Sequence, residues 1–202
     1  MCIQGRFFTI MPKKQGKGSQ ALPALYGGEF MRKFKRGKKP NMDAINLLVS
    51  ILVCYPEIGT VSFEPEDNTL KLTYVLGKVP EKSLQESAAA FIEDSIVTYH
   101  SLEGFSDGHI AIVFDVQDGA AFLHIIRDMN TISQGEIGLV STLVREQFAA
   151  VLISDLNRDA AEEADVVREE VIDRMLGSMK VNRVGERMIG IREEGRVMVF
   201  NK

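Results

Sequence analysis

The dipeptide Asp118-Gly119 constrains the fold of this chain more than any other pair of residues. Asp-Gly favours the tight type I′ turn, in which both central residues need positive φ, and this turn joins neighbouring antiparallel strands. Residues 109–116 and 120–126 on either side are rich in apolar side chains. The pattern predicts a β-hairpin whose first strand has one apolar face. That face carries Ile110, Ile112, Phe114 and Val116.

Two further hairpins are predicted from the same signals. Residues 60–64 and 70–76 flank a Pro-Glu-Asp-Asn turn, and residues 188–191 and 196–200 flank a Glu-Glu-Gly turn at 193–195. An isolated hairpin is only marginally stable in water. We therefore expect the last hairpin to be integral, either by extending the main sheet or by pairing with a partner chain.

The first two predicted helices have clear start and stop signals. Asn41 caps a helix that runs to Tyr55, where Pro56 stops it. Pro80 opens the second helix in its first turn, and Gly104 ends it. One apolar face of the second helix is predicted to hold Leu84, Ala88, Phe91, Ile92, Ile96 and Tyr99.

The third and fourth predicted helices follow the second hairpin. A capping box at 133–136, Ser-Gln-Gly-Glu, starts a helix whose apolar stripe continues to Val151. The fourth helix spans 160–179. The order is thus helix, hairpin, helix, hairpin, helix, helix, hairpin. It predicts a single α+β domain over 41–202, with an antiparallel sheet built from hairpins and helices packed mainly on one face.

Residues 1–40 lack helical or strand periodicity and are predicted to be a disordered, basic segment. The codons of Gly-Gly-Glu-Phe-Met at 27–31 can spell a bacterial ribosome-binding site followed by a start codon. Residues 1–30 would then be an upstream translation, and the product would begin at Met31. The alternative interpretation is an ordinary Gly-rich linker.

The charge of the chain is strongly asymmetric. Residues 31–39 hold six Lys or Arg and no acid, whereas residues 40–202 hold 14 Lys or Arg against 27 Asp or Glu. An acidic surface repels phosphates, so the folded body is a poor candidate for general nucleic-acid binding. The basic arm is the candidate polyanion contact, or else a solubilising tail or a segment that folds back on the acidic body. Its cations are Arg32, Lys33, Lys35, Arg36, Lys38 and Lys39.

The sequence holds no recognisable catalytic, cofactor or metal motif, and we expect no cofactor. A Gly-rich phosphate loop is missing. His109 and His124 could approach each other across the second hairpin, but zinc needs more ligands than this pair provides. Two cysteines are too few for a disulfide framework, which indicates a cytoplasmic location. The apolar run at 45–55 is too short to span a membrane.

The fourth predicted helix is acidic, and its carboxylates form a candidate surface for a protein partner. The alternative is the solvated face of an amphipathic helix. The candidate residues are Glu162, Glu163, Glu169, Glu170 and Asp173.

The leading functional hypothesis is a non-enzymatic bacterial cytoplasmic protein that acts through protein contacts, in regulation or assembly. The first alternative is an RNA- or ribosome-associated factor that uses the basic arm and the C-terminal hairpin, because residues 180–202 hold six Lys or Arg and three Glu. The second alternative is an enzyme whose site is assembled from scattered residues. Oligomeric state is not specified by these patterns.

The charge pattern predicts that residues 32–39 carry any affinity of the chain for polyanions. Changing the six cations of this arm to Gln should abolish salt-dependent retention on heparin or RNA, because no counterions are then released on binding. The salt concentration at elution measures this. Unchanged retention would move the binding surface to the C-terminal arginines, which are Arg183, Arg187, Arg192 and Arg196.

Overall fold

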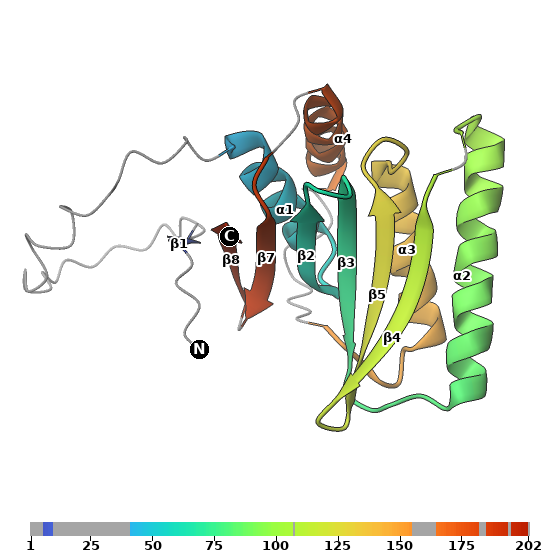
Figure 1. The fold of residues 1–202 in the computed structure, drawn as a ribbon. Coiled ribbons are helices and arrows are strands. Elements are labelled where there is room, and N and C mark those ends of the chain that lie inside the picture. The colour runs from blue at the N-terminus through green and yellow to red at the C-terminus, as the bar shows by residue number, and fades with distance from the viewer. Residues whose placement is uncertain are drawn as a thin grey trace, which may run out of the picture.

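The structure is a computed structural model that describes residues 6–9, 41–106, 108–154, 165–181, 185–193 and 195–201. For residues 6–9 and 165–169 it describes the backbone alone. Within these ranges the chain forms four helices and an antiparallel sheet of eight strands (Figure 1). The α+β class predicted from the sequence is confirmed.

The elements follow the predicted order, with short additional strands at β1 and β6. The helices are α1 (Met42–Cys54), α2 (Lys82–Glu103), α3 (Gln134–Gln147) and α4 (Asp165–Val181). The strands are β1 (Arg6–Thr9), β2 (Ile58–Glu64), β3 (Thr69–Leu76), β4 (Ile110–Gln117), β5 (Ala120–Asp128), β6 (Leu152–Ile153), β7 (Met188–Glu193) and β8 (Arg196–Asn201).

The strand order places the C-terminal hairpin inside the sheet. Neighbouring strands run β1-β8-β7-β2-β3-β5-β4, and β6 pairs with β3 off this path. In the β2–β7 pair Thr60 lies opposite Ile191 and Ser62 opposite Ile189. The hairpin therefore extends the main sheet, which was the first of the two arrangements expected for it.

One strand falls within the N-terminal segment for which disorder is predicted. β1 pairs with β8, with Arg6 opposite Asn201. The rest of 1–40, including the basic arm, lies outside the described residues. A start at Met31 stays a prediction.

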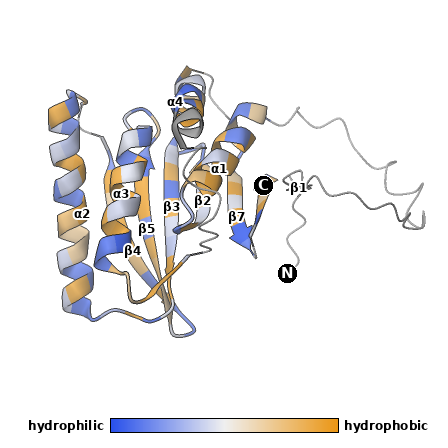
Figure 2. Ribbon diagram, turned by 180° about the vertical axis from the view of Figure 1, so that it is seen from behind, coloured by the Kyte–Doolittle hydropathy of each residue, from blue (hydrophilic) through white to orange (hydrophobic). Residues whose placement is uncertain are grey.

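The helices cover one face of the sheet and leave the other face without a helix layer in the described part of the chain. Figure 2 shows α1, α3 and α4 in front of the strands, with α2 at the side next to β4. Alternate residues of β3 follow this division, since Leu72 and Tyr74 are buried beneath the helices while Lys71 and Val75 on the opposite face are partly exposed. We call the face without helices the open face.

Local interactions explain where α1 begins and where the second hairpin turns. The side chain of Asn41 accepts hydrogen bonds from the backbone N–H groups of Asp43 (3.0 Å) and Ala44 (3.2 Å), as predicted. The second hairpin turns through Asp118 at φ 51° and Gly119 at φ 83°, which is the positive-φ pair that a type I′ turn requires.

Two predicted helix boundaries are wrong by a few residues. α2 begins at Lys82 with Glu81 as its N-cap, so Pro80 lies just outside the helix and not in its first turn. The carbonyl of Pro80 instead accepts a hydrogen bond from the Gln85 amide (2.8 Å). α3 ends at Gln147, before Val151, because the chain turns there towards β6.

The predicted apolar face of α2 is also only partly correct. The structure buries Ala88, Ile92 and Ile96, but leaves Leu84 38% and Phe91 47% exposed. α2 lies at the edge of the fold, where its main packing contacts are with α3 and β4. Its apolar surface is therefore wider than the surface available to cover it.

We expect Gly190 to be essential to the packing of α1 on β7. A Cβ added there would lie 2.9 Å from Leu52 and 3.3 Å from the Cβ of Leu48. Gly190→Ala should lower the free energy of unfolding by about 1–3 kcal/mol through overpacking. As the control, Gly177→Ala within α4 meets nothing within 4 Å and should raise it by about 0.5–1 kcal/mol. Urea unfolding of both variants measures the difference, and equal effects would contradict the packing described.

Candidate functional site

A buried ion pair joins the end of β5 to the first turn of α3. Arg127 and Glu136 are 0% and 1% exposed. The Nε of Arg127 donates to Oε1 of Glu136, and Nη2 donates to Oε2 at 3.2 Å. The contact is bidentate, which is the strongest geometry for an arginine–carboxylate pair.

His100, one turn before the end of α2, completes this network. Its side chain is buried, and its Nε2 lies 2.7 Å from Oε2 of Glu136. A guanidinium has only donors, so the Nε2 proton is directed to Glu136 and not to Arg127, whose Nη2 lies 3.2 Å away. The ring thereby ties α2 to both β5 and α3.

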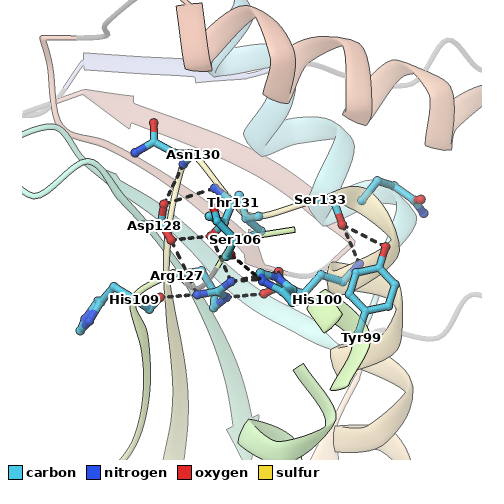
Figure 3. A network of polar contacts seen from close by, with 12 residues as sticks. Tyr99, His100, Ser106, His109, Arg127, Asp128, Asn130, Thr131 and Ser133 are labelled. Carbon is cyan, nitrogen blue, oxygen red and sulfur yellow. Dashed lines mark hydrogen bonds and ion pairs between the residues drawn. The ribbon is translucent and has the colours of Figure 1, made fainter. Parts of the chain in front are cut away.

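The remaining N–H groups of Arg127 bind the segment just before β4 and the loop just after β5 (Figure 3). Nη1 donates to the backbone carbonyl of His109, and Nη2 donates to the hydroxyl of Thr131 at 3.2 Å. We call Arg127, Glu136 and His100 the buried triad. Because its polar atoms are engaged with one another, its role in this structure is to fix the positions of the surrounding segments.

Asp128 is among the groups positioned in this way, and its own loop holds it further. Its Oδ1 accepts hydrogen bonds from the N–H groups of Asn130 (3.0 Å) and Thr131 (3.2 Å). Burial raises the pKa of Asp128, but hydrogen bonds from the Thr131 hydroxyl and the Asn130 backbone, with the charge of Arg127, outweigh it and leave the pKa below its usual value. Asp128 is therefore held as a carboxylate.

Gly108 allows the chain before β4 to pass close to this loop. A Cβ at this position would lie 2.1 Å from Oγ1 of Thr131 and 2.2 Å from Oδ2 of Asp128. These distances are too short for any side chain. The position of His109 relative to Asp128 thus depends on a glycine that is one residue away.

A hollow of about 450 Å³ lies on the open face, where the ends of β3 and β5 meet. Its acidic groups are the carboxylates of Glu64, Asp67 and Asp128, and its basic groups are Lys71 and His109. Glu64 forms an ion pair with Arg187, with 2.5 Å between Oε1 and Nε. Asp67 and Asp128 contribute the remaining negative charge of the rim, although Oδ2 of Asp128 also lies 3.8 Å from Nη1 of Arg127, which is paired more closely with Glu136. Thr69 and Ile126 complete the lining.

Apolar side chains extend from the hollow across the open face of β3, β5 and β4. Val75 lies opposite Phe122, and Ile126 lies opposite Ala111. Val113, next to them on β4, is 47% exposed. The open face therefore combines an acidic hollow with an adjoining apolar area.

His124 lies within this face but is not part of the hollow. Its Nδ1 is 3.0 Å from the hydroxyl oxygen of Thr73. Burial and the nearby charge of Lys71 lower the pKa of His124, and Asp115 offsets part of this effect. The ring is therefore poorly suited to carry a charge at neutral pH.

The two histidines considered as a metal pair are not brought together. His124 lies opposite Val113, whereas His109 precedes β4 and approaches Asp128. The register of the hairpin separates them, because it pairs Ile110 with Arg127 and so brings His109 beside Asp128, four residues along β5 from His124. Across the described ranges, no group of His, Cys, Asp and Glu side chains is arranged to hold a metal ion.

The other predicted site residues are only partly visible. The basic arm, Glu162 and Glu163 lie outside the described residues, and only the backbone of Glu169 is described. Glu170 is exposed. Asp173 accepts a hydrogen bond from the N–H of Gln134 at 3.1 Å, so one of its oxygens caps α3. Partner binding by this acidic helix stays a prediction.

Sequence reasoning missed the buried triad, although two of its members follow simple periodicities. His100 continues the spacing of Ile92 and Ile96 along α2, and Arg127 continues the alternation of Leu123 and Ile125 along β5. Both positions face the core by pattern alone. The sequence predicts a capping box of Ser133 and Glu136, and the structure shows the Ser133 half of it. Ser133 Oγ accepts a hydrogen bond from the Glu136 N–H at 3.2 Å, while the Glu136 carboxylate binds Arg127 and His100.

Comparisons with known proteins do not assign this chain. No protein-family model, no curated protein and no solved structure matches it. Among the described helices, none has the length and apolar character needed to cross a membrane. Function is therefore inferred from the geometry of the chain alone.

Breaking the buried triad should destabilise the fold strongly. Arg127→Met leaves the Glu136 carboxylate buried without its cation, and should lower the free energy of unfolding by about 3–5 kcal/mol. The double variant Arg127→Met with Glu136→Gln removes the stranded charge and should recover part of this loss. Denaturant unfolding measures both variants.

The matched control for this test is an exposed ion pair. Lys82 and Glu86 lie 3.7 Å apart with side chains 87% and 70% exposed. Lys82→Met should therefore change the stability by no more than a few tenths of a kcal/mol. A double variant that is no more stable than Arg127→Met would show that the unpaired charge is not the cause.

Proposed function

We propose that this chain is a binding protein whose open face holds a segment of a partner protein. The segment would place a basic side chain in the hollow and apolar side chains on the adjoining strands. The observation that carries the proposal is the hollow of about 450 Å³ on a sheet face that none of the described helices covers. Its volume lies within the range of about 300–1,000 Å³ that is usual for binding pockets.

The charge of the hollow favours a basic partner group over a phosphate. Asp67 and Asp128 line it, Glu64 is paired with Arg187, and the Arg127 guanidinium near Asp128 is itself paired with the buried Glu136. Among the described residues of the lining, Lys71 is the only lysine, against the three carboxylates of Glu64, Asp67 and Asp128. A phosphate would be repelled there, whereas a Lys or Arg side chain would gain charge-assisted hydrogen bonds.

The apolar area favours a protein over a small cation. Val113, Phe122 and Val75 extend the surface beyond the reach of a single small ion. Protein interfaces combine an apolar centre with a polar rim in this way. The buried triad would contribute by holding Asp128 and the His109 backbone in place before the partner arrives, which lowers the entropy lost on binding.

A matched pair of variants tests the proposal. Val113 on the open face and Val53 on α1 are 47% and 42% exposed, on opposite sides of the molecule. Affinity purification of the tagged chain from its native cells should recover a partner protein. Val113→Lys should reduce its recovery at least tenfold by adding a positive charge beside the hollow, whereas Val53→Lys should leave recovery unchanged.

Equal loss with both lysine variants, or with neither, would contradict a binding site on the open face. Recovery should also fall with Asp67→Asn, because the basic group of the partner then loses one of its carboxylates. Recovery of a polyanion bound by the basic arm would not fall with Val113→Lys or Asp67→Asn, because an added positive charge or a lost negative charge does not weaken polyanion binding. The two classes of partner are thereby distinguished in one experiment.

A further inference from the structure

The outer surface of α2 is apolar at regular intervals. Figure 1 shows α2 at the side of the fold beyond β4, at the opposite end of the sheet from β1. Leu84, Phe91 and Leu102 are 38%, 47% and 80% exposed. Their spacings of seven and eleven residues correspond to whole numbers of helical turns, so they lie along one line of the helix. We call this line, together with Ser95, the outer stripe of α2.

Charge is nearly excluded from the outer stripe and its immediate neighbours. Lys82, Glu86 and Glu93 fall on a different line of α2, about a third to a half of a turn away. The residues that flank the stripe are mostly hydroxyl-bearing, and Asp94 and Glu103 are the charged side chains of α2 nearest to it, about a quarter of a turn away. The stripe borders the buried face of α2 that holds Ala88 and Ile92, and an exposed helix usually carries charged side chains outside its buried face.

Three hydroxyl groups in or next to the stripe already donate hydrogen bonds to backbone carbonyls of α2. Ser87 donates to the carbonyl of Leu84 at 3.2 Å, Ser95 to that of Phe91 at 2.7 Å, and Thr98 to that of Asp94 at 2.7 Å. Their donors would therefore stay satisfied if another protein surface excluded water from this face. The face can be buried without leaving these donors unpaired.

The spacing along the stripe is symmetric. Leu84, Phe91, Ser95 and Leu102 are separated by seven, four and seven residues. If two copies of α2 cross antiparallel about a twofold axis near residue 93, Leu84 of one copy meets Leu102 of the other. Phe91 then meets the small side chain of Ser95. We infer that the outer stripe of α2 is a contact between two copies of this chain, arranged antiparallel.

The charge of the chain restricts where a second copy can dock. Residues 40–202 hold 14 Lys or Arg against 27 Asp or Glu, so two copies repel each other over most of their surfaces. The outer stripe lets them meet without bringing rows of carboxylates together. Asp94 alone would approach its counterpart near the twofold axis, which opposes the contact.

The area of the stripe sets the strength of this dimer. A helix of 22 residues is about 33 Å long, and a strip covering some 40% of its circumference offers roughly 400 Å² per copy. The total of roughly 800 Å² lies below the size of stable interfaces. The dimer is therefore weak and reversible. Because this surface is separate from the hollow, the inference is independent of the proposed function.

Analytical ultracentrifugation of the full chain over a range of concentrations tests the contact. We expect a monomer–dimer equilibrium whose dissociation constant falls as NaCl is raised, because salt screens the acidic bodies. Phe91→Lys should raise the dissociation constant at least tenfold. Asp94→Asn should lower it severalfold by removing the repulsion at the axis.

The matched control lies on the same helix. Val97 is 49% exposed, as much as Phe91, but it lies about 120° away around α2. Val97→Lys should leave the dissociation constant within about twofold of the original. A chain that is monomeric at every concentration, or a dimer weakened equally by both lysine variants, would overturn the inference. Circular dichroism melts of each variant show that it folds.

Cross-linking tests the antiparallel arrangement directly. A mixture of the Leu84→Cys and Leu102→Cys proteins should form a mixed disulfide faster than either protein forms its own. In the antiparallel pair, two copies of position 84 are separated by about 27 Å along the helices, from 18 residues of 1.5 Å rise. Faster formation of the 84–84 disulfide would show a parallel contact and overturn the assigned geometry.

Discussion

The ion pair between Arg127 and Glu136 holds together the half of the molecule in which function is proposed. It joins β5 to α3 directly, and it joins α2 through His100. Removing these charges from water costs several kcal/mol for each ion, and the bidentate geometry offsets that cost only while every partner stays in place. The pair therefore acts more as a constraint on where these elements can lie than as a source of net stability.

The local structure of this fold was predictable because it depends on residues close together in sequence. The Asp118-Gly119 turn and the Asn41 cap need only their immediate neighbours, and both form as expected. The boundary of α2 was less predictable, because Pro80 suits a first turn but its carbonyl is used by a side chain. The exposure of Phe91 depends on what lies next to α2, which periodicity does not specify.

The candidate site was not predictable for a related reason. The inward direction of Arg127 is visible in the alternation of β5, but nothing in the sequence identifies Glu136 or His100 as its partners. The hollow brings together the ends of three strands and a turn, and the carboxylate at 128 joins those at 64 and 67 of the first hairpin only because β3 pairs with β5. Strand order is a property of the whole chain, since one more inserted or missing strand would separate them.

The pairing of β2 with β7 has a consequence for how the chain folds as it is made. Thr60 pairs with Ile191, so the edge of β2 that binds β7 has no partner until the ribosome has added the β7–β8 hairpin. Contacts between such distant residues form slowly, because a long loop must close first. During synthesis the backbone of β2 is an unprotected strand edge, which is a starting point for aggregation. Chaperones that shield nascent chains would therefore affect the yield of this protein more than its final stability.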